Sequence, residues 1–212
     1  MSRAMNRVVH SVVNRAVHAA AANTVTTIYL VRHGETDWNA DGRCQGTTDV
    51  PMNAVGVAQV QALAQELAHV AFDAAYTSPL ARTRETATAI LRRQRLRAMP
   101  VPELIELSYG ALQGTTSASW DPSFATAWRD DPWSVAFPGG ESLAMVRERA
   151  VPVLQRIVAM HSGETVLISG HGHLNRVLAL HTLGRPEHEF WALEQANASA
   201  LVLHFPVAAT PE

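Results

Sequence analysis

Two histidines lie in glycine-flanked turns, and each directly follows an apolar run that is typical of a buried strand. His33 comes with Arg32 after the apolar residues 28–31, and His171 follows the apolar residues 166–168. A neutral imidazole is a nucleophile near pH 7, and the planar fork of arginine matches a phosphate group. These residues therefore point to phosphate chemistry, with both turns contributing to one pocket.

The composition restricts the possible function classes. The 212 residues suit one domain, and 47% apolar with 17% charged residues is typical of a globular protein. A formal net charge of -2 gives no electrostatic reason to expect nucleic acid as a partner. The sequence contains no lysine, which excludes a Walker phosphate loop and a pyridoxal Schiff base. The single cysteine, Cys44, excludes intrachain disulfides and thiolate zinc clusters.

Short apolar runs alternate with helical patterns, which predicts an α/β sheet with crossover helices. Strands are expected near residues 26–31, 74–77, 99–102 and 165–169, with an edge strand over 200–203. Helices are expected from a cap at Asn53 to about residue 70, from Pro79 to Leu96, and from Ser142 towards Met160. Pro152 should kink the third helix or mark its true start.

The carboxyl ends of the strands are where such a sheet binds ligands, because helix N-termini aim backbone N–H groups there. Both histidine turns lie at such ends, and so does the segment that carries Arg82 in the first turn of the next helix. We therefore expect Arg32, His33, Arg82 and His171 to converge on an anion pocket that holds a nucleophile.

Five ordered motifs carry a resemblance that covers about residues 26–205. They are Arg32 to Thr36 with Asn39 and the run Arg43 to Gly46, Ser78 to Ala87, Glu106 with Tyr109 to Gly114, Gly139 to Ser142, and Ser169 to Gly172. With these motifs the chain resembles the histidine phosphatase superfamily, also called the phosphoglycerate mutase-like family. The resemblance implies a three-layer α/β/α sandwich with a mostly parallel mixed sheet of about six strands and one antiparallel edge.

The resemblance also implies a mechanism, in which His33 attacks the phosphorus of a phosphomonoester and water later releases phosphate. Glu106 would donate the proton to the leaving oxygen, while Arg32, Arg82 and His171 would hold the phosphoryl oxygens. Further substrate contacts are implied for Asn39, Gln45, Gly46 and Gly172. No metal and no cofactor are expected.

Several assignments have alternatives. Glu103 and Glu141 also lie near the motif that indicates Glu106, and a solvated acid without a role is the plain alternative. His173 is interpreted as a rim or structural residue. Cys44 is expected to be a packed or partly exposed thiol without chemistry.

An aromatic insert near residues 115–137 is expected to cover the mouth of the pocket. Its aromatic side chains could stack on a substrate, or they could only pack the lid as a small satellite core. The insert contains one basic residue, Arg129, amid three aspartates, which favours a phosphatase over a bisphosphoglycerate-dependent mutase. A noncatalytic phospholigand-binding protein is the alternative of another class.

The predicted organisation has three parts: an N-terminal extension over residues 1–25, a catalytic domain over 26–205 and a tail over 206–212. Arginines without acids in the extension resemble a targeting peptide, but a loosely ordered extension is the favoured interpretation. No segment reaches the length of a membrane span. The expected partner is a small-molecule phosphomonoester in the cytoplasm, without nucleic acid or membrane, and a homodimer is one open oligomeric state.

Overall fold

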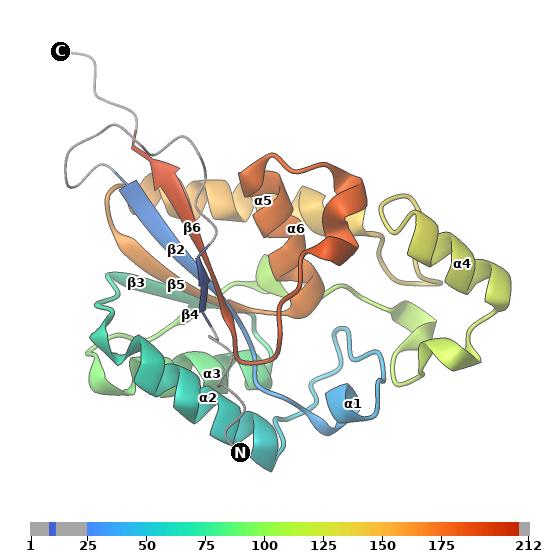
Figure 1. Cartoon of the computed structure of the whole chain (residues 1–212), viewed down its shortest axis with the longest axis horizontal. Coiled ribbons are helices and arrows are strands. Elements are labelled where there is room, and N and C mark those ends of the chain that lie inside the picture. Colours follow the sequence, from blue (N-terminus) through green and yellow to red (C-terminus); the bar gives the residue numbers. More distant parts are fainter. Residues whose placement is uncertain (1–8, 12–24, 208–212) are drawn as a thin grey trace, which may run out of the picture.

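A six-stranded mixed sheet forms the centre of the computed structural model, which describes residues 9–11 and 25–207 (Figure 1). The strands are β1 (Val9–Ser11), β2 (Val25–Arg32), β3 (Ala74–Thr77), β4 (Met99–Pro100), β5 (Thr165–Gly170) and β6 (Ala200–Pro206). Their order is β1-β6-β2-β5-β3-β4, in which β2, β5, β3 and β4 run parallel. β6 runs antiparallel to β2 and parallel to β1. The expected mixed, mostly parallel sheet is therefore confirmed.

The expected position of the C-terminal strand was wrong. In the described part of the chain β6 lies between β2 and β1, so that β1 forms the edge beyond it. Within the expected extension the structure describes β1 and Val25, which already belongs to β2, and the sequence signal missed β1 because only three residues pair. The other residues of the extension, 1–8 and 12–24, lie outside the described residues, so its expected order stays a prediction.

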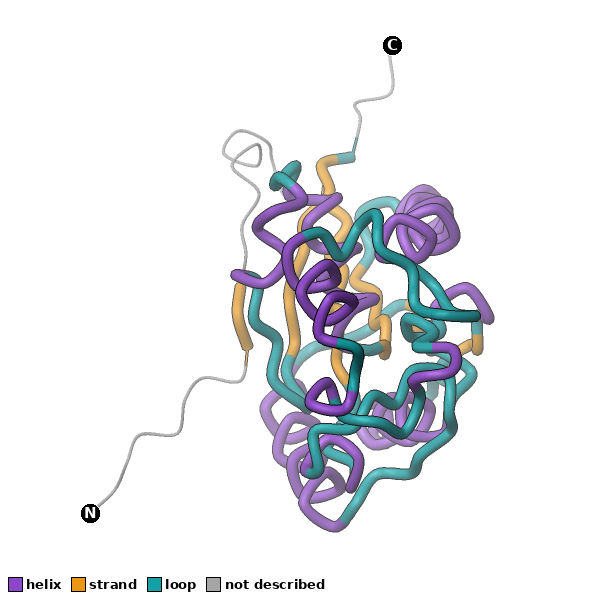
Figure 2. The backbone as a smooth tube through the Cα atoms, turned by 90° about the vertical axis from the view of Figure 1, so that its right-hand side faces the viewer, coloured by secondary structure: helices purple, strands orange, loops and turns teal. Residues whose placement is uncertain are grey.

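Helices cover both faces of the sheet. The α-helices are α1 (Asp37–Ala40), α2 (Ala54–Glu66), α3 (Ala81–Ile90), α4 (Pro122–Asp130), α5 (Leu143–Met160) and α6 (Gly172–Leu183). The 3-10 turns are η1 (Leu67–His69), η2 (Leu91–Arg93), η3 (Pro102–Leu104), η4 (Gly110–Leu112), η5 (Ser117–Ser119) and η6 (Glu187–Ala192). α2 and α3 pack on one face, and α5 and α6 pack on the other, which gives the three layers (Figures 1 and 2).

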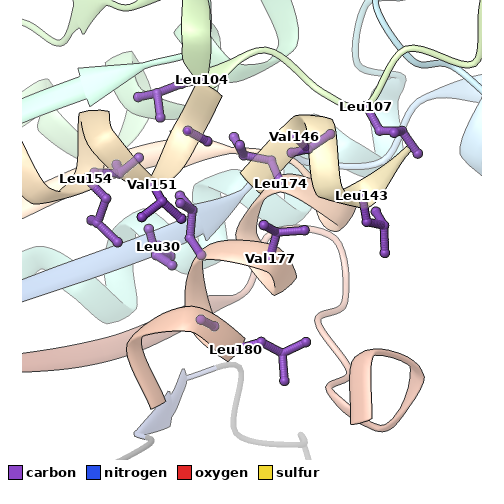
Figure 3. Packing of buried hydrophobic residues seen from close by; sticks show 14 of the residues in the cluster. Leu30, Leu104, Leu107, Leu143, Val146, Val151, Leu154, Leu174, Val177 and Leu180 are labelled. Carbon is purple, nitrogen blue, oxygen red and sulfur yellow. The ribbon is translucent and has the colours of Figure 1, made fainter. Parts of the chain in front are cut away.

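Side-chain alternation along β2 connects the two cores. Leu30 joins the cluster of α5 and α6, where Figure 3 shows it among Val151, Leu154 and Val177. Val31 points to the opposite face and joins the cluster of α2 and α3. Because burying one such side chain contributes about 1.5–3 kcal/mol, these two clusters fix the strand that ends at Arg32, directly before His33.

The predicted helix boundaries were partly right. Asn53 caps α2, since its side chain accepts the Gly56 N–H at 2.8 Å. Ser142 caps α5, and Pro152 lies inside this helix instead of starting it. The helix expected to reach Leu96 ends at Ile90 and continues as η2.

The strand expected over residues 99–102 is restricted to two residues, because its prolines cannot donate to the sheet. In the part of the chain that the structure describes, no helix has the length and apolar composition needed to cross a membrane.

Candidate active site

The carboxyl ends of three neighbouring parallel strands meet at one cavity of about 270 Å³. β2 ends at Arg32 and is followed by His33, β3 leads to Arg82 in the first turn of α3, and β5 leads to His171 at the N-cap of α6. The cavity is lined by Arg32, His33, Trp38, Asn39, Gly42, Arg43, Cys44, Gln45, Gly46, Arg82, Glu106, Tyr109, Gly172, His173 and Arg176. The structure thus brings the predicted site residues together, with His171 beside the lining, its ring centroid 5.3 Å from that of His33.

The orientation of His33 defines its reactive nitrogen. The side chain is buried, and Nδ1 lies 2.7 Å from the carbonyl oxygen of Gly34. A carbonyl can only accept, so Nδ1 carries the proton and Nε2 keeps its lone pair. Burial, followed by the charges of Arg82 and Arg32, lowers the pKa of His33 to about 3. The imidazole is therefore neutral over the physiological pH range, as a nucleophile requires.

Arg32 and Arg82 place unpaired donors at the cavity. Arg32 donates from Nη1 to the Gln195 carbonyl at 2.7 Å, and Arg82 donates to the carbonyls of Thr48 and Gly46 at 2.7 and 2.9 Å. The Nε atom of each arginine is buried and has no hydrogen-bond partner among the described residues. Two buried cations with unused N–H groups make a strong anion site.

His171 offers another unpaired nitrogen, on a ring whose centroid lies 5.3 Å from that of His33. The ring is fully buried, and its Nε2 lies 2.8 Å from Ser78 Oγ. Its Nδ1 has no partner within the described chain. Burial, followed by the charge of Arg82, holds the pKa of His171 well below its usual range. A neutral His171 that accepts from the Ser78 hydroxyl can thus donate from Nδ1 to an oxyanion.

Glu106 is a buried carboxyl at the N-terminus of α6. Its Oε1 accepts N–H groups of Leu107 and Leu174 at 2.9 and 3.1 Å, and Oε2 accepts the His173 N–H at 3.1 Å. Burial raises its pKa, but the interactions with His173 and the backbone N–H of Leu107 outweigh burial, so the pKa lies well below its usual range. Glu106 is therefore ionised until another negative charge comes near.

The two alternative acids do not line the cavity. Glu103 is exposed, and Glu141 forms an ion pair with Arg149 at 2.7 Å. Arg149 also donates to the Glu106 carbonyl at 3.1 Å, while Glu141 accepts the Ser108 N–H at 2.9 Å. This pair therefore fastens the segment that carries Glu106.

The four expected substrate contacts lie in the cavity wall. Gly46 has a φ of 54°, and a Cβ there would lie 2.5 Å from Gln113 Oε1, so only glycine fits. A Cβ on Gly172 would lie 3.4 Å from Arg32 Nε, at ordinary contact distance, so the start of α6 lies beside this donor. Asn39 Oδ1 accepts a hydrogen bond from the Asn197 side chain, and Gln45 Oε1 has no partner within the described structure.

Sequence reasoning missed several wall residues, above all Arg176. His173, which was interpreted as a rim or structural residue, lines the cavity and contacts Glu106. Arg176 follows Gly172 by four positions, and this helical spacing could have placed both on one face of α6. Arg176 also keeps an Nε without a partner in the described residues. Cys44 lines the cavity as a thiol whose pKa is raised by burial to about 11, which is consistent with the expected lack of chemistry.

The aromatic insert packs against the main core. Trp128, Trp133 and Phe137 are buried in the cluster of α5 and α6, with Trp120 and Phe124 partly buried beside them. The rings therefore pack, as one of the two interpretations expected, but they join the main core and do not form the expected satellite. Within the described ranges, no group of three His, Cys, Asp or Glu side chains is arranged to hold a metal ion.

Comparisons with known proteins agree with this geometry. The family model of the histidine phosphatase superfamily (branch 1) matches residues 28–208. The chain is 36% identical over 186 residues to a metal-independent phosphoserine phosphatase of Arabidopsis thaliana, covering 85% of this chain and 76% of that protein. It is 31% identical over 209 residues to a 2,3-bisphosphoglycerate-dependent phosphoglycerate mutase of Pseudoalteromonas atlantica, covering 82% and 92% of the two chains. The solved structure of Bacillus stearothermophilus YhfR superimposes with a TM-score of 0.78 at 32% identity, covering 84% of this chain and 90% of that chain.

Proposed function

Because this chain belongs to the histidine phosphatase superfamily (branch 1), we propose that it hydrolyses phosphomonoesters through a phosphohistidine on His33, without a metal ion. One observation carries the proposal: Arg32 and Arg82, which line one cavity with the neutral His33, and His171, whose ring lies 5.3 Å from that of His33, each keep a buried nitrogen without a partner in the described chain. Buried donors of this kind are costly unless a ligand uses them, and a phosphoryl group offers three oxygens for them.

In the first step, His33 Nε2 forms a bond to phosphorus as the ester P–O bond breaks. Arg32 and Arg82 hold the charge that spreads over the phosphoryl oxygens. A bound phosphate dianion raises the pKa of a nearby carboxyl, so substrate binding favours the protonated form of Glu106. Glu106 then gives this proton to the departing alcohol oxygen.

In the second step, ionised Glu106 takes a proton from water while the water oxygen bonds to phosphorus. The P–N bond breaks, and its electron pair returns to His33 Nε2. Inorganic phosphate then leaves, Glu106 returns its proton to solvent, and His33, Glu106 and the two arginines regain their starting states.

Phosphate release in the presence of a chelator tests the proposal. The experiment compares native protein with His33→Ala and with Arg84→Met, a matched control on the exposed side of α3. We expect chelator-resistant release from the native protein and the control, and none from His33→Ala. Release that chelator abolishes, or that His33→Ala retains, would overturn the proposal.

Phosphoglycerate mutase activity is a second candidate. The lid residue Arg129 pairs with Asp130 at the surface and does not line the cavity, which argues against a second phosphate site in the lid. Arg43 and Arg176 line the cavity from other elements, however, and could hold the second acid group of a phosphoglycerate. A coupled assay that follows the interconversion of 3-phosphoglycerate and 2-phosphoglycerate decides between phosphatase and mutase. A mutase would interconvert the two esters faster than it releases phosphate.

The organisation of the chain gives three further proposals. We place the catalytic domain at residues 26–205, with its lid near 115–137, and the activity in the cytoplasm. We also propose a homodimer, and light scattering would test this proposal by measuring the molar mass of the protein in solution. A noncatalytic phospholigand-binding protein stays the alternative of another class, and it would form no phosphohistidine.

A further inference from the structure

His173 makes two different contacts with the candidate acid. Its backbone N–H donates to Glu106 Oε2 at 3.1 Å, and its Nδ1 lies 3.7 Å from the same oxygen. The Nδ1 atom also lies 3.3 Å from Tyr109 Oη. Because Oε1 of Glu106 already accepts two N–H groups, Oε2 is the oxygen with more capacity left to carry a proton. His173 therefore adjoins the atom that the proposed mechanism uses.

Aromatic rings from three separate segments enclose the imidazole of His173. Phe190 stacks on it with centroids 5.7 Å apart at 24°, and Trp191 meets it edge-on at 6.2 Å. Tyr109, from the acid-bearing segment, lies 5.8 Å away, and Trp128 of α4 lies 6.3 Å away. We call these four rings the aromatic cage. Reorienting the imidazole would require the cage to move, so the cage fixes the direction of Nδ1.

The lid is fastened to the rest of the cage by indole hydrogen bonds. Trp191 of η6 donates from Nε1 to the Arg129 carbonyl at the end of α4, at 3.0 Å. Trp133 donates from Nε1 to the Glu187 carbonyl at the start of η6, also at 3.0 Å. The lid helix and η6 therefore hold Trp128 and Trp191 around His173 as one packed unit.

We propose that His173 is a positioning residue that directs the Glu106 carboxyl towards the leaving oxygen, and that the aromatic cage makes the lid part of this positioning. The inference rests on the proposed function, in which Glu106 is the proton donor. A phenyl ring at this position could fill the cage, but it would place no nitrogen beside Oε2. The nitrogen is therefore the part of His173 that packing alone does not explain.

Two substitutions separate the nitrogen from the ring. His173→Phe keeps a ring in the cage and removes Nδ1, whereas His173→Asn keeps a nitrogen at nearly the position of Nδ1. The readout is the ratio of kcat/KM for an alkyl phosphate, glycerol 3-phosphate, to that for p-nitrophenyl phosphate, whose weakly basic leaving group needs little protonation. We expect His173→Phe to lower this ratio about tenfold, as a partial loss of general acid catalysis, and His173→Asn to restore most of it. An unchanged ratio in His173→Phe would overturn the inference.

Two tryptophan substitutions, one inside the aromatic cage and one outside it, test the role of the lid. Trp191→Leu removes a cage ring and its bond to α4, while Trp120→Leu alters a lid ring that contacts Phe124 and Phe137. We expect Trp191→Leu to lower the ratio and Trp120→Leu to leave it unchanged. Equal ratios in these two variants would refute the role of the lid.

The variant Glu106→Gln distinguishes a failure of the inference about His173 from a failure of the proposed function. It should lower the same ratio about a hundredfold if Glu106 is the acid. If Glu106→Gln does so and His173→Phe does not, the inference fails while the proposed function stands. If Glu106→Gln leaves the ratio unchanged, the acid assignment fails, and the inference fails with it.

Discussion

Replacing Arg82 with methionine removes one phosphoryl contact from the middle of the proposed site. Arg82 has no exposed surface, and it uses both Nη atoms on the carbonyls of Thr48 and Gly46. Nε is the nitrogen of Arg82 without a partner in the described chain, and one charge-assisted hydrogen bond from it to the substrate is worth about 1.5–3 kcal/mol. This energy corresponds to a loss of about 10- to 150-fold in kcat/KM.

The assay follows phosphate release from p-nitrophenyl phosphate and inhibition by inorganic phosphate, for native protein, Arg82→Met and Arg84→Met. Arg84 is exposed on the same helix and should change neither quantity beyond about twofold, as a screened surface charge. Circular dichroism shows whether Arg82→Met is folded, because it also loses two bonds to the loop over residues 46–48. A folded Arg82→Met that matches Arg84→Met in kcat/KM would refute the assignment of Nε to the phosphoryl group.

Three other perturbations test separate parts of the structure. The pKa of His33 is lowered to about 3, so the unfolded chain binds a proton that the folded chain does not. The free energy of unfolding from urea titrations should therefore fall by up to about 1.4 kcal/mol per pH unit as pH drops from about 6.5 towards 3, and His33→Asn should reduce this slope. Gly56→Ala should lower the free energy of unfolding by about 1–3 kcal/mol, because the added Cβ would lie 2.0 Å from the Glu35 carbonyl oxygen. Thermal melts check this, and an unchanged melting temperature would contradict the close packing. Arg149→Met should lower kcat for glycerol 3-phosphate more than for p-nitrophenyl phosphate, since Arg149 fastens the Glu106 segment, and equal effects on both esters would contradict this role.

The sequence predicted the elements whose signals are local. Periodicity and the Asn53 and Ser142 caps located α2 and α5, and apolar runs located the strands that end at the two histidine turns. Because parallel strands end at the same edge of a sheet, the convergence of Arg32, His33, Arg82 and His171 could also be predicted.

The rest depends on tertiary contacts that local patterns do not encode. Nothing in the residues around His173 reveals the aromatic cage, whose rings come from α4, η6 and the acid-bearing segment. The choice of Glu106 over Glu141 rests on an ion pair with Arg149, eight residues away on the next helix. The pairing of β1 with β6 likewise joins segments from opposite ends of the chain.

Trapping the phosphorylated enzyme tests the central claim most directly. The protein would be mixed with a radiolabelled phosphomonoester and chelator, quenched in alkali to preserve a phosphohistidine, and digested for mass spectrometry. The account predicts label on the peptide at His33 in the native protein, and none in His33→Ala. Rapid phosphate release without any labelled His33, or label on another residue, would contradict it.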